Sequence, residues 1–205
     1  MPDPQAPSGS IRLGRVAGVP VYLDRTWLIL GAFIAWTGWQ AGRDLGTTTG
    51  IAYAGWLVLG ILTAVLGHEI AHAVAGRMLG FRVHRIVATL WGGHTSYDGT
   101  GSTPGRAAAI AVSGPLANLG LAGIGWIGLQ ALTGPVAQFV LWWFVAINLL
   151  LAAFNLLPGL PLDGGQVVHS LVWKASGRRD TALLVAGWLG RLLTVAVVVF
   201  FAVLP

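Results

Sequence analysis

Three ionisable side chains interrupt an otherwise apolar stretch, VLGHEIAHAVAG, at residues 65–76. His68 and His72 are four residues apart, so on a helix both imidazoles project from the same face, one turn apart. This spacing allows both rings to bind a single tetrahedral Zn²⁺ through neutral nitrogen atoms. Glu69 lies about 100° around the helix from His68, where its carboxylate can reach a water on the metal without being a ligand. The stretch therefore matches the H-E-x-x-H arrangement of zinc hydrolases, in which the glutamate is the general base.

An alternative is that the three polar residues are chance occupants of a helix bundle with a structural role only. Ionisable side chains within a membrane span cost about 3 kcal/mol each on insertion scales and usually mark function. Glu69 is also the only glutamate in the chain. We therefore interpret the cluster as a catalytic metal site.

The composition predicts a membrane protein. Of the 205 residues, 55% are hydrophobic and 9% are charged, whereas soluble domains carry about a quarter charged residues. The chain has no cysteine, which excludes disulfides and thiolate metal sites. The net charge of +5 comes from cations that flank the hydrophobic runs. In that position they act as topology signals, and we expect no nucleic-acid partner.

Five apolar segments are candidates to cross a bilayer, for which about 20 residues are needed. They are residues 26–40, 51–78, 107–132, 136–157 and 181–204. Short alternating patterns before the first segment and over residues 81–99 are typical of strands, and the second is predicted to form a hairpin around Gly92 and Gly93. The predicted fold is an all-α polytopic membrane protein of five to six transmembrane helices, with short β-strands and a hairpin at the cytoplasmic side.

The predicted domain organisation is a single membrane-embedded unit over residues 11–205. It contains the hairpin of residues 81–99 and a cytoplasmic segment of residues 158–180. Residues 1–10 are rich in proline and serine and are predicted to be a disordered tail. They lack the features of a signal peptide.

Basic residues predict the orientation. Ten of the twelve lysines and arginines fall on one side of the membrane, and Arg43 alone falls on the other. The positive-inside rule then places the N-terminus in the cytoplasm. His72 and His68 precede Arg77 by five and nine residues, which puts them about 8 to 14 Å from the cytoplasmic end of their helix.

Two histidines leave a zinc site in need of a third ligand, and Asp163 is the candidate. It lies in NLLPGLPLDGG, residues 155–165, where two prolines cannot continue a helix and two glycines permit a tight turn. Such an irregular segment can carry Asp163 into the bundle, because irregular backbone at membrane depth is tolerated against protein or water. This stretch by itself leaves open an ordinary helix-ending loop with an exposed aspartate.

Together the two stretches resemble the site-2 protease family of intramembrane zinc metalloproteases. The family pattern is H-E-x-x-H on one span, followed by N-x-x-P-x-x-P-x-D-G at the end of a later one. HEIAH matches the first part, and five residues match the second: Asn155, Pro158, Pro161, Asp163 and Gly164. SGPLANL, residues 113–119, looks like the middle core helix of the family, and LWGG resembles its glycine-containing hairpin.

The resemblance implies that His68, His72 and Asp163 hold one Zn²⁺ per chain and that Glu69 is the catalytic base. It implies substrate-binding roles for four further residues: Asn118, Asn155, Gly92 and Gly93. The expected protein is a zinc metalloendopeptidase of the bacterial inner membrane, a multi-pass protein that performs regulated intramembrane proteolysis. It would cleave peptide bonds in or near transmembrane segments of membrane-tethered substrates. Its expected partners are such a transmembrane substrate, the lipid bilayer and a regulatory membrane protein.

A zinc or proton transporter that uses the same histidines, glutamate and aspartate is the alternative from another functional class. It requires polar residues that continue along the helix to the outer face, whereas residues 51–67 are almost wholly apolar. A protease-like scaffold without activity is disfavoured by the intact Glu69. The sequence leaves open whether His94, which follows the two glycines, approaches the site.

Overall fold

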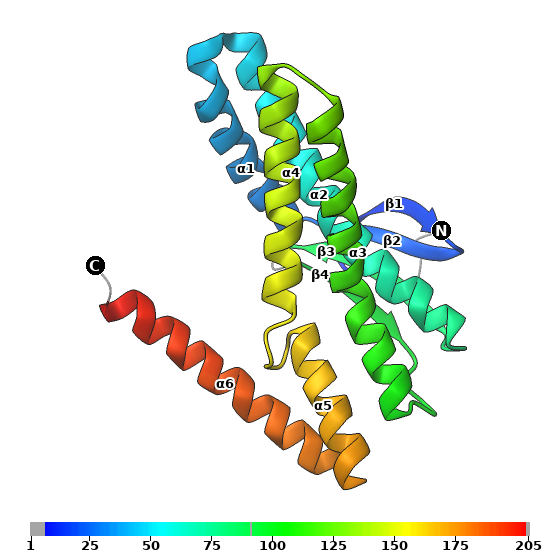
Figure 1. Ribbon diagram of the computed structural model, residues 1–205. Coiled ribbons are helices and arrows are strands. Elements are labelled where there is room, and N and C mark those ends of the chain that lie inside the picture. Colours follow the sequence, from blue (N-terminus) through cyan, green and yellow to red (C-terminus); the bar gives the residue numbers. More distant parts are fainter. Residues whose placement is uncertain (1–6, 91, 204–205) are drawn as a thin grey trace.

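Long apolar runs form the helices of the computed structural model, which describes residues 7–90 and 92–203 (Figure 1). The helices are α1 (Thr26–Gly42), α2 (Thr47–Met78), α3 (Pro104–Ala131), α4 (Pro135–Asn155), α5 (Asp163–Ser176) and α6 (Arg179–Val203), with a short 3₁₀ turn, η1 (Arg43–Leu45). The strands are β1 (Ser10–Val16), β2 (Val19–Asp24), β3 (Val83–Thr89) and β4 (Gly92–Tyr97). The mainly helical fold with short strands is confirmed.

Among the described residues, four helices are long and apolar enough to cross a membrane: α2, α3, α4 and α6. The first predicted span is also a helix, α1, but its 17 residues make it shorter than these four. The apolar part of α6 is only 11% buried inside the protein, and Figure 1 shows its second half standing clear of the other helices. Such a surface requires lipid around it. The protein is therefore a membrane protein.

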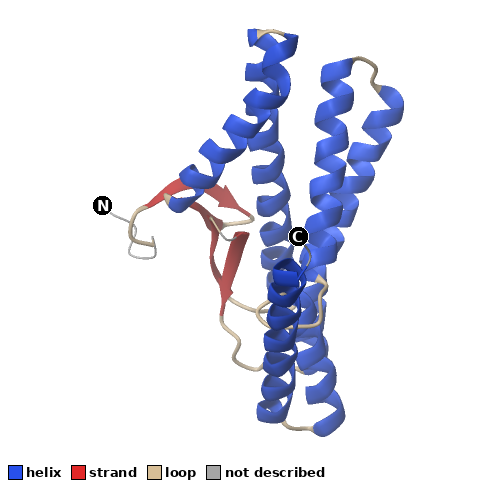
Figure 2. Ribbon diagram, turned by 90° about the vertical axis from the view of Figure 1, so that its left-hand side faces the viewer, coloured by secondary structure: helices blue, strands red, loops and turns tan. Residues whose placement is uncertain are grey.

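A small sheet lies beside the helices (Figure 2). Its strand order is β1-β2-β3-β4, with antiparallel hairpins at both ends and a parallel pair, β2 and β3, in the middle. Parallel neighbours need a long crossover connection, and α1 and α2 provide it. One face of the sheet packs on α2, with two clusters of buried residues: Val19, Val21, Ile86 and Ala73, and Leu23, Trp27, Ala88 and Val65.

The hairpin lies where it was expected, but Gly92 and Gly93 are not its turn. Thr89 pairs with Gly92, and Ala88 pairs with Gly93. The chain therefore reverses between Thr89 and Gly92, and both glycines belong to β4. Gly92 has a φ of +116°, which disfavours any residue with a side chain.

The predicted N-terminal tail reaches into the first strand. Residues 1–6 of the predicted tail lie outside the described residues. Ser10 is already the first residue of β1, and its main-chain N–H donates to the Pro7 carbonyl at 3.2 Å. The predicted tail therefore overlaps the sheet at its last residue.

The loop between α4 and α5 is held by α6. The Leu160 N–H donates to the Ala186 carbonyl at 3.2 Å. Gly190 lies so close to the loop that a Cβ atom on it would overlap the Leu160 carbonyl oxygen. The buried residues of α6 are all small, Ala182, Ala186 and Gly190, so this helix can approach the loop that leads into Asp163.

We expect Gly190→Ala to lower the unfolding free energy by about 1 to 3 kcal/mol, because the added methyl group has no room against the Leu160 carbonyl. Gly187→Ala on the same helix is the matched control, since a Cβ there meets no atom within 4 Å. Thermal unfolding of the purified protein in detergent measures both. Equal melting temperatures for the two variants would contradict the packing described here.

Candidate metal centre

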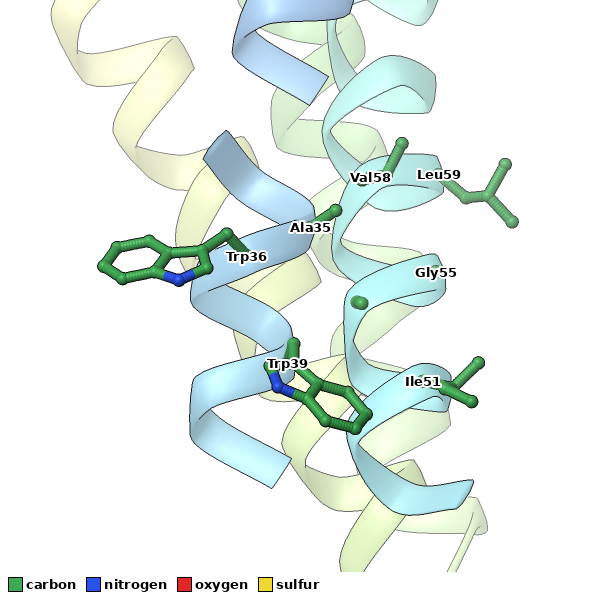
Figure 3. Close-up of a pocket in the computed structure, with 8 residues that line it drawn as sticks. Ala35, Trp36, Trp39, Ile51, Gly55, Val58 and Leu59 are labelled. Atoms are coloured by element: carbon green, nitrogen blue, oxygen red, sulfur yellow. The ribbon is translucent and has the colours of Figure 1, made fainter. Parts of the chain in front are cut away.

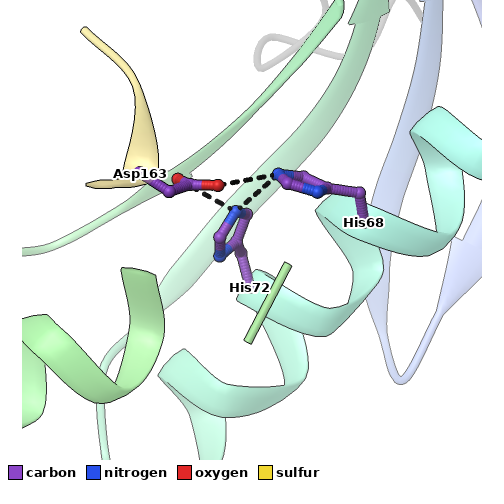
Figure 4. A group of neighbouring side chains, drawn as sticks. All are labelled: His68, His72 and Asp163. Carbon is purple, nitrogen blue, oxygen red and sulfur yellow. Dashed lines mark hydrogen bonds and ion pairs between the residues drawn. The ribbon is translucent and has the colours of Figure 1, made fainter. Parts of the chain in front are cut away.

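Three potential ligands from two distant parts of the chain converge on one point (Figure 4). His68 and His72 project from successive turns of α2, and Asp163 is the first residue of α5. His68 Nε2 lies 3.0 Å from Asp163 Oδ2, and His72 Nε2 lies 3.3 Å from Asp163 Oδ1. The two Nε2 atoms are 3.0 Å apart. One ligand atom from each residue lies within 4.8 Å of the others, so all three can hold a single ion.

The opposite sides of both imidazoles are bound to α3. His68 Nδ1 lies 2.7 Å from Asn118 Oδ1, and His72 Nδ1 lies 2.7 Å from the Ile110 carbonyl oxygen. Both partners are oxygens without a hydrogen, so each Nδ1 carries the proton and donates. In the neutral rings each Nε2 then presents a lone pair. Both lone pairs point toward each other and toward a carboxylate.

This donor set fits a divalent cation. Two lone pairs 3.0 Å apart repel one another unless a cation or proton lies between them. Asp163 Oδ2 is buried and accepts no hydrogen bond from the described residues, although it is 3.0 Å from His68 Nε2. Two imidazole nitrogens and one carboxylate oxygen form a typical three-ligand set of catalytic zinc sites.

Gly114 on α3 provides the space for both rings. A Cβ atom at this position would overlap His72 Nε2 and lie 2.6 Å from His68 Nε2. Gly114 belongs to the SGPLANL stretch, residues 113–119. Its position against the metal-binding nitrogens depends on how α3 crosses α2, for which the sequence carries no separate signal.

Glu69 is buried beside the three candidate metal ligands and is not one of them. Its carboxylate contacts β4, where the Thr95 hydroxyl lies 2.8 Å from Glu69 Oε2. Gly93 faces the same side chain, and a Cβ there would overlap Glu69 Cγ and lie 2.9 Å from Oε1. Gly93 is therefore a glycine because Glu69 packs against it.

Asn118 occupies a different place from the one expected for a substrate-binding residue. Its side chain is fully buried, and besides accepting from His68 it donates from Nδ2 to the Ala64 carbonyl at 3.1 Å and to Asn148 Oδ1 at 2.9 Å. All of these contacts are with protein groups, so the amide orients His68. It has no exposed polar atom with which to bind a substrate.

Asn148 on α4 was not singled out from the sequence. It is fully buried and donates from Nδ2 to the Phe144 carbonyl at 2.8 Å. Its Oδ1 accepts from Asn118, which places it two hydrogen bonds from His68. A lone amide in the middle of an apolar span was the available signal, because buried polar groups in membranes require a partner.

Neither of the other two predicted substrate-binding residues, Asn155 and Gly92, has a described hydrogen bond or ion pair to His68, His72 or Asp163. Asn155 donates from Nδ2 to the Leu151 carbonyl at 3.0 Å within its own helix. A Cβ on Gly92 would meet no atom within 4 Å. His94 is exposed and alternates along β4 with Gly93 and Thr95, so it faces away from Glu69.

His169 on α5 is a buried histidine that does not belong to the candidate ligand set. Its Nδ1 has no hydrogen-bond partner among the described residues, and its ring lies 5.9 Å from that of Trp173. Burial, together with the nearby Arg179 cation, lowers the pKa of His169. It therefore stays neutral at pH 7 and packs as an aromatic ring.

The large apolar grooves do not include the three candidate metal ligands. A groove of about 660 Å³ between α1 and α2 is lined by eight residues (Figure 3): Ala35, Trp36, Trp39, Ile51, Ala54, Gly55, Val58 and Leu59. Its nearest residue on α2, Leu59, precedes His68 by nine residues, about 13 Å along the helix. The groove offers no acid, base or metal ligand, so it is not a reaction site.

Comparison with known proteins gives concordant matches. The family model described as Peptidase family M50 matches residues 128–197. "Putative zinc metalloprotease sll0528" from Synechocystis sp. is 34% identical over 192 residues, which are 90% of this chain and 50% of that protein. "Putative zinc metalloprotease Rip3" from Mycobacterium tuberculosis is 35% identical over 199 residues, which are 92% of this chain and 50% of that protein. The chain thus spans about half the length of these curated relatives.

A solved structure has a similar fold. The site-2 protease from Methanocaldococcus jannaschii superimposes with a TM-score of 0.67 and 22% sequence identity. The match covers 95% of this chain and 85% of that one. At this identity the likeness concerns the fold.

We expect Gly114→Ala to weaken the binding of divalent metal by about 10- to 100-fold, because the methyl group displaces both metal-binding nitrogens. Gly120→Ala on the same helix is the matched control, since a Cβ there meets no atom within 4 Å. Elemental mass spectrometry of the purified variants, followed by metal titration, measures the effect. Equal metal affinity in the two variants would contradict the position of α3 against the imidazoles.

Proposed function

The chain belongs to peptidase family M50, the site-2 protease family, and we propose that it cleaves peptide bonds in or near transmembrane segments of membrane-tethered proteins. The observation that carries this proposal is the convergence of His68, His72 and Asp163, with Glu69 beside them and outside the ligand set. The names of the relatives, which describe zinc metalloproteases, support it.

One Zn²⁺ is the metal proposed for this site, held by Nε2 of His68, Nε2 of His72 and the carboxylate of Asp163. When bound, zinc polarises a carbonyl group and lowers the pKa of water toward about 7. The hydrogen bonds from both Nδ1 atoms to α3 keep the two Nε2 atoms directed at the ion.

Glu69 acts as the general base in this proposal. It takes a proton from the attacking water and transfers it to the nitrogen of the leaving amine, so the proton lost by the nucleophile ends on the product. Thr95 donates to Oε2, and Oε1 is left to accept the proton. Burial of Glu69, which is 5% exposed, keeps bulk water from competing for this oxygen.

The transporter alternative has little support. The polar chain above His68 consists of Asn118 and Asn148 and ends at the Phe144 carbonyl. Both amides are fully buried and are bound to protein groups. An ion that passed this point would have to displace those hydrogen bonds.

We infer that the site opens to the cytoplasm of a bacterial cell. The distribution of basic residues supports an N-terminus on that side. Asp163 follows α4 at the end of the bundle where α2 also ends, so the three ligands share one depth, about 8 to 14 Å from Arg77. Water then has a short path to the reacting bond.

A transmembrane substrate must unwind before it is cut, because its carbonyl groups are hydrogen-bonded within a helix. In the sheet order β4 is an edge strand, and the side of β4 away from β3 carries no further strand among the described residues. An unwound substrate that adds to this edge would satisfy its main-chain groups while its side chains remain unspecified. The substrate strand would then lie next to Glu69.

We expect Glu69→Gln to abolish detectable cleavage while zinc remains bound, because a general base contributes about 10²- to 10⁴-fold and Glu69 is not a ligand. Asp163→Ala should lose both zinc and activity. Cleavage of single-span test proteins in proteoliposomes, with zinc content measured on the same samples, tests both variants. Full activity in Glu69→Gln would refute the proposed protease.

We expect cleavage to fall in the cytoplasmic half of the substrate span and to be faster when helix-breaking residues lie there. A Gly-Pro pair reduces the cost of unwinding, which is on the order of 2 to 7 kcal/mol for each backbone group left unpaired. Mass spectrometry of products from test substrates with Gly-Pro at varied depth locates the cut. Faster cleavage of an unbroken leucine helix would argue against unwinding as the barrier.

A further inference from the structure

One hydrogen-bond donor reaches the carboxylate of Glu69 in the described parts of the chain, and it comes from the sheet. We propose that Thr95 is a positioning residue that holds the Glu69 carboxylate in the orientation needed to accept a proton. This inference rests on the proposed proteolytic function. It assigns to β4 a part in the reaction that is separate from any binding of substrate along its edge.

Thr95 contacts Glu69 at two points. Its Oγ1 lies 2.8 Å from Glu69 Oε2 and 2.9 Å from the Glu69 main-chain oxygen. A hydroxyl has a single hydrogen, so it is shared between the two acceptors or alternates between them. In both cases the carboxylate is kept close to the helix backbone and cannot extend freely.

The position of Thr95 is set by the core of the sheet. Thr95 pairs with Ile86 on β3. Ile86 is fully buried and packs with Ala73 of α2, one turn after Glu69. The hydroxyl and the carboxylate are therefore fixed to the same packed interface, which gives the hydrogen bond a defined geometry.

Gly93 restricts the movement of the Glu69 carboxylate on the side that Thr95 does not contact. A Cβ on this residue would lie 2.9 Å from both Glu69 Cδ and Oε1. The glutamate thus fits between the backbone of Gly93 and the hydroxyl of Thr95, two residues apart on one strand. Without the hydroxyl, rotation about the side-chain bonds of Glu69 would be limited only by van der Waals contacts.

The orientation has a chemical consequence. Glu69 lies next to His68 along α2, so a freely rotating carboxylate can approach the metal-binding nitrogens and act as an extra ligand. With Oε2 held by Thr95, the carboxylate stays outside the ligand set, and Oε1, which lies against Gly93, is the oxygen that would accept the proton of the attacking water. A misplacement of about 1 Å in a catalytic group can cost on the order of 10²-fold in rate.

The test compares Thr95→Val, which keeps the shape and removes the hydroxyl, with Thr95→Ser, which keeps the hydroxyl. Ser96→Ala, on the next residue of β4, is the matched control. We expect Thr95→Val to lower kcat by about 10- to 100-fold, with KM and zinc content within about twofold of the wild type. Thr95→Ser should recover kcat to within about threefold, and Ser96→Ala should leave it unchanged.

A second measurement is independent of cleavage. The visible absorption of the protein loaded with Co²⁺ reports the ligands of the metal. Thr95→Val should change this spectrum, because the released carboxylate approaches the ion, and Thr95→Val combined with Glu69→Gln should restore it. If the wild type cleaves no substrate yet the spectra change in this way, the protease proposal fails, and what stands is that Thr95 keeps the Glu69 carboxylate away from the metal ligands. Unchanged spectra, unchanged kcat in an active protein, or equal losses in Thr95→Val and Thr95→Ser would overturn the role of Thr95.

Discussion

Two hydrogen bonds from the imidazoles of α2 to α3 are the interactions on which the rest of the site depends. They assign the protons of His68 and His72 to Nδ1 and leave both Nε2 atoms free to bind a cation. Both imidazoles are buried, and each Nδ1 faces α3 rather than bulk water, so its partner comes from that neighbouring helix. Asn118, which accepts from His68, is itself buried and needs a partner, and its Nδ2 donates to Asn148 on α4. Three helices are thereby tied to the orientation of a single imidazole.

The need to pair buried polar groups also explains how Asp163 reaches His68 and His72. The loop before Asp163 is irregular backbone inside a helical protein, and its polar groups and its shape need support. α6 supplies a carbonyl for the Leu160 N–H and a glycine face that lets the loop approach. A helix that otherwise contacts mainly lipid therefore helps to position a ligand.

The sheet contributes in a different way. Its inner face packs on α2 next to the two histidines, so an edge strand and a buried carboxylate share one interface. β4 combines Gly93, which gives Glu69 space, with Thr95, which binds it. The outer edge of the same strand suits the proposed extended substrate. Binding of substrate and orientation of the base would thus be functions of one strand.

Features that depend on local spacing were determined by the sequence itself. The apolar runs predicted the helices, and the four-residue spacing of His68 and His72 predicted two rings on one face, because helix geometry acts within a turn. Asp163 became a ligand candidate through its prolines, its glycines and the family resemblance. The partners of Asn118, Gly114 and Thr95 were decided only by the tertiary structure. Those partners lie 26 or more residues away in the chain. They meet because packed helices and strands cross one another, and no local sequence pattern encodes that crossing.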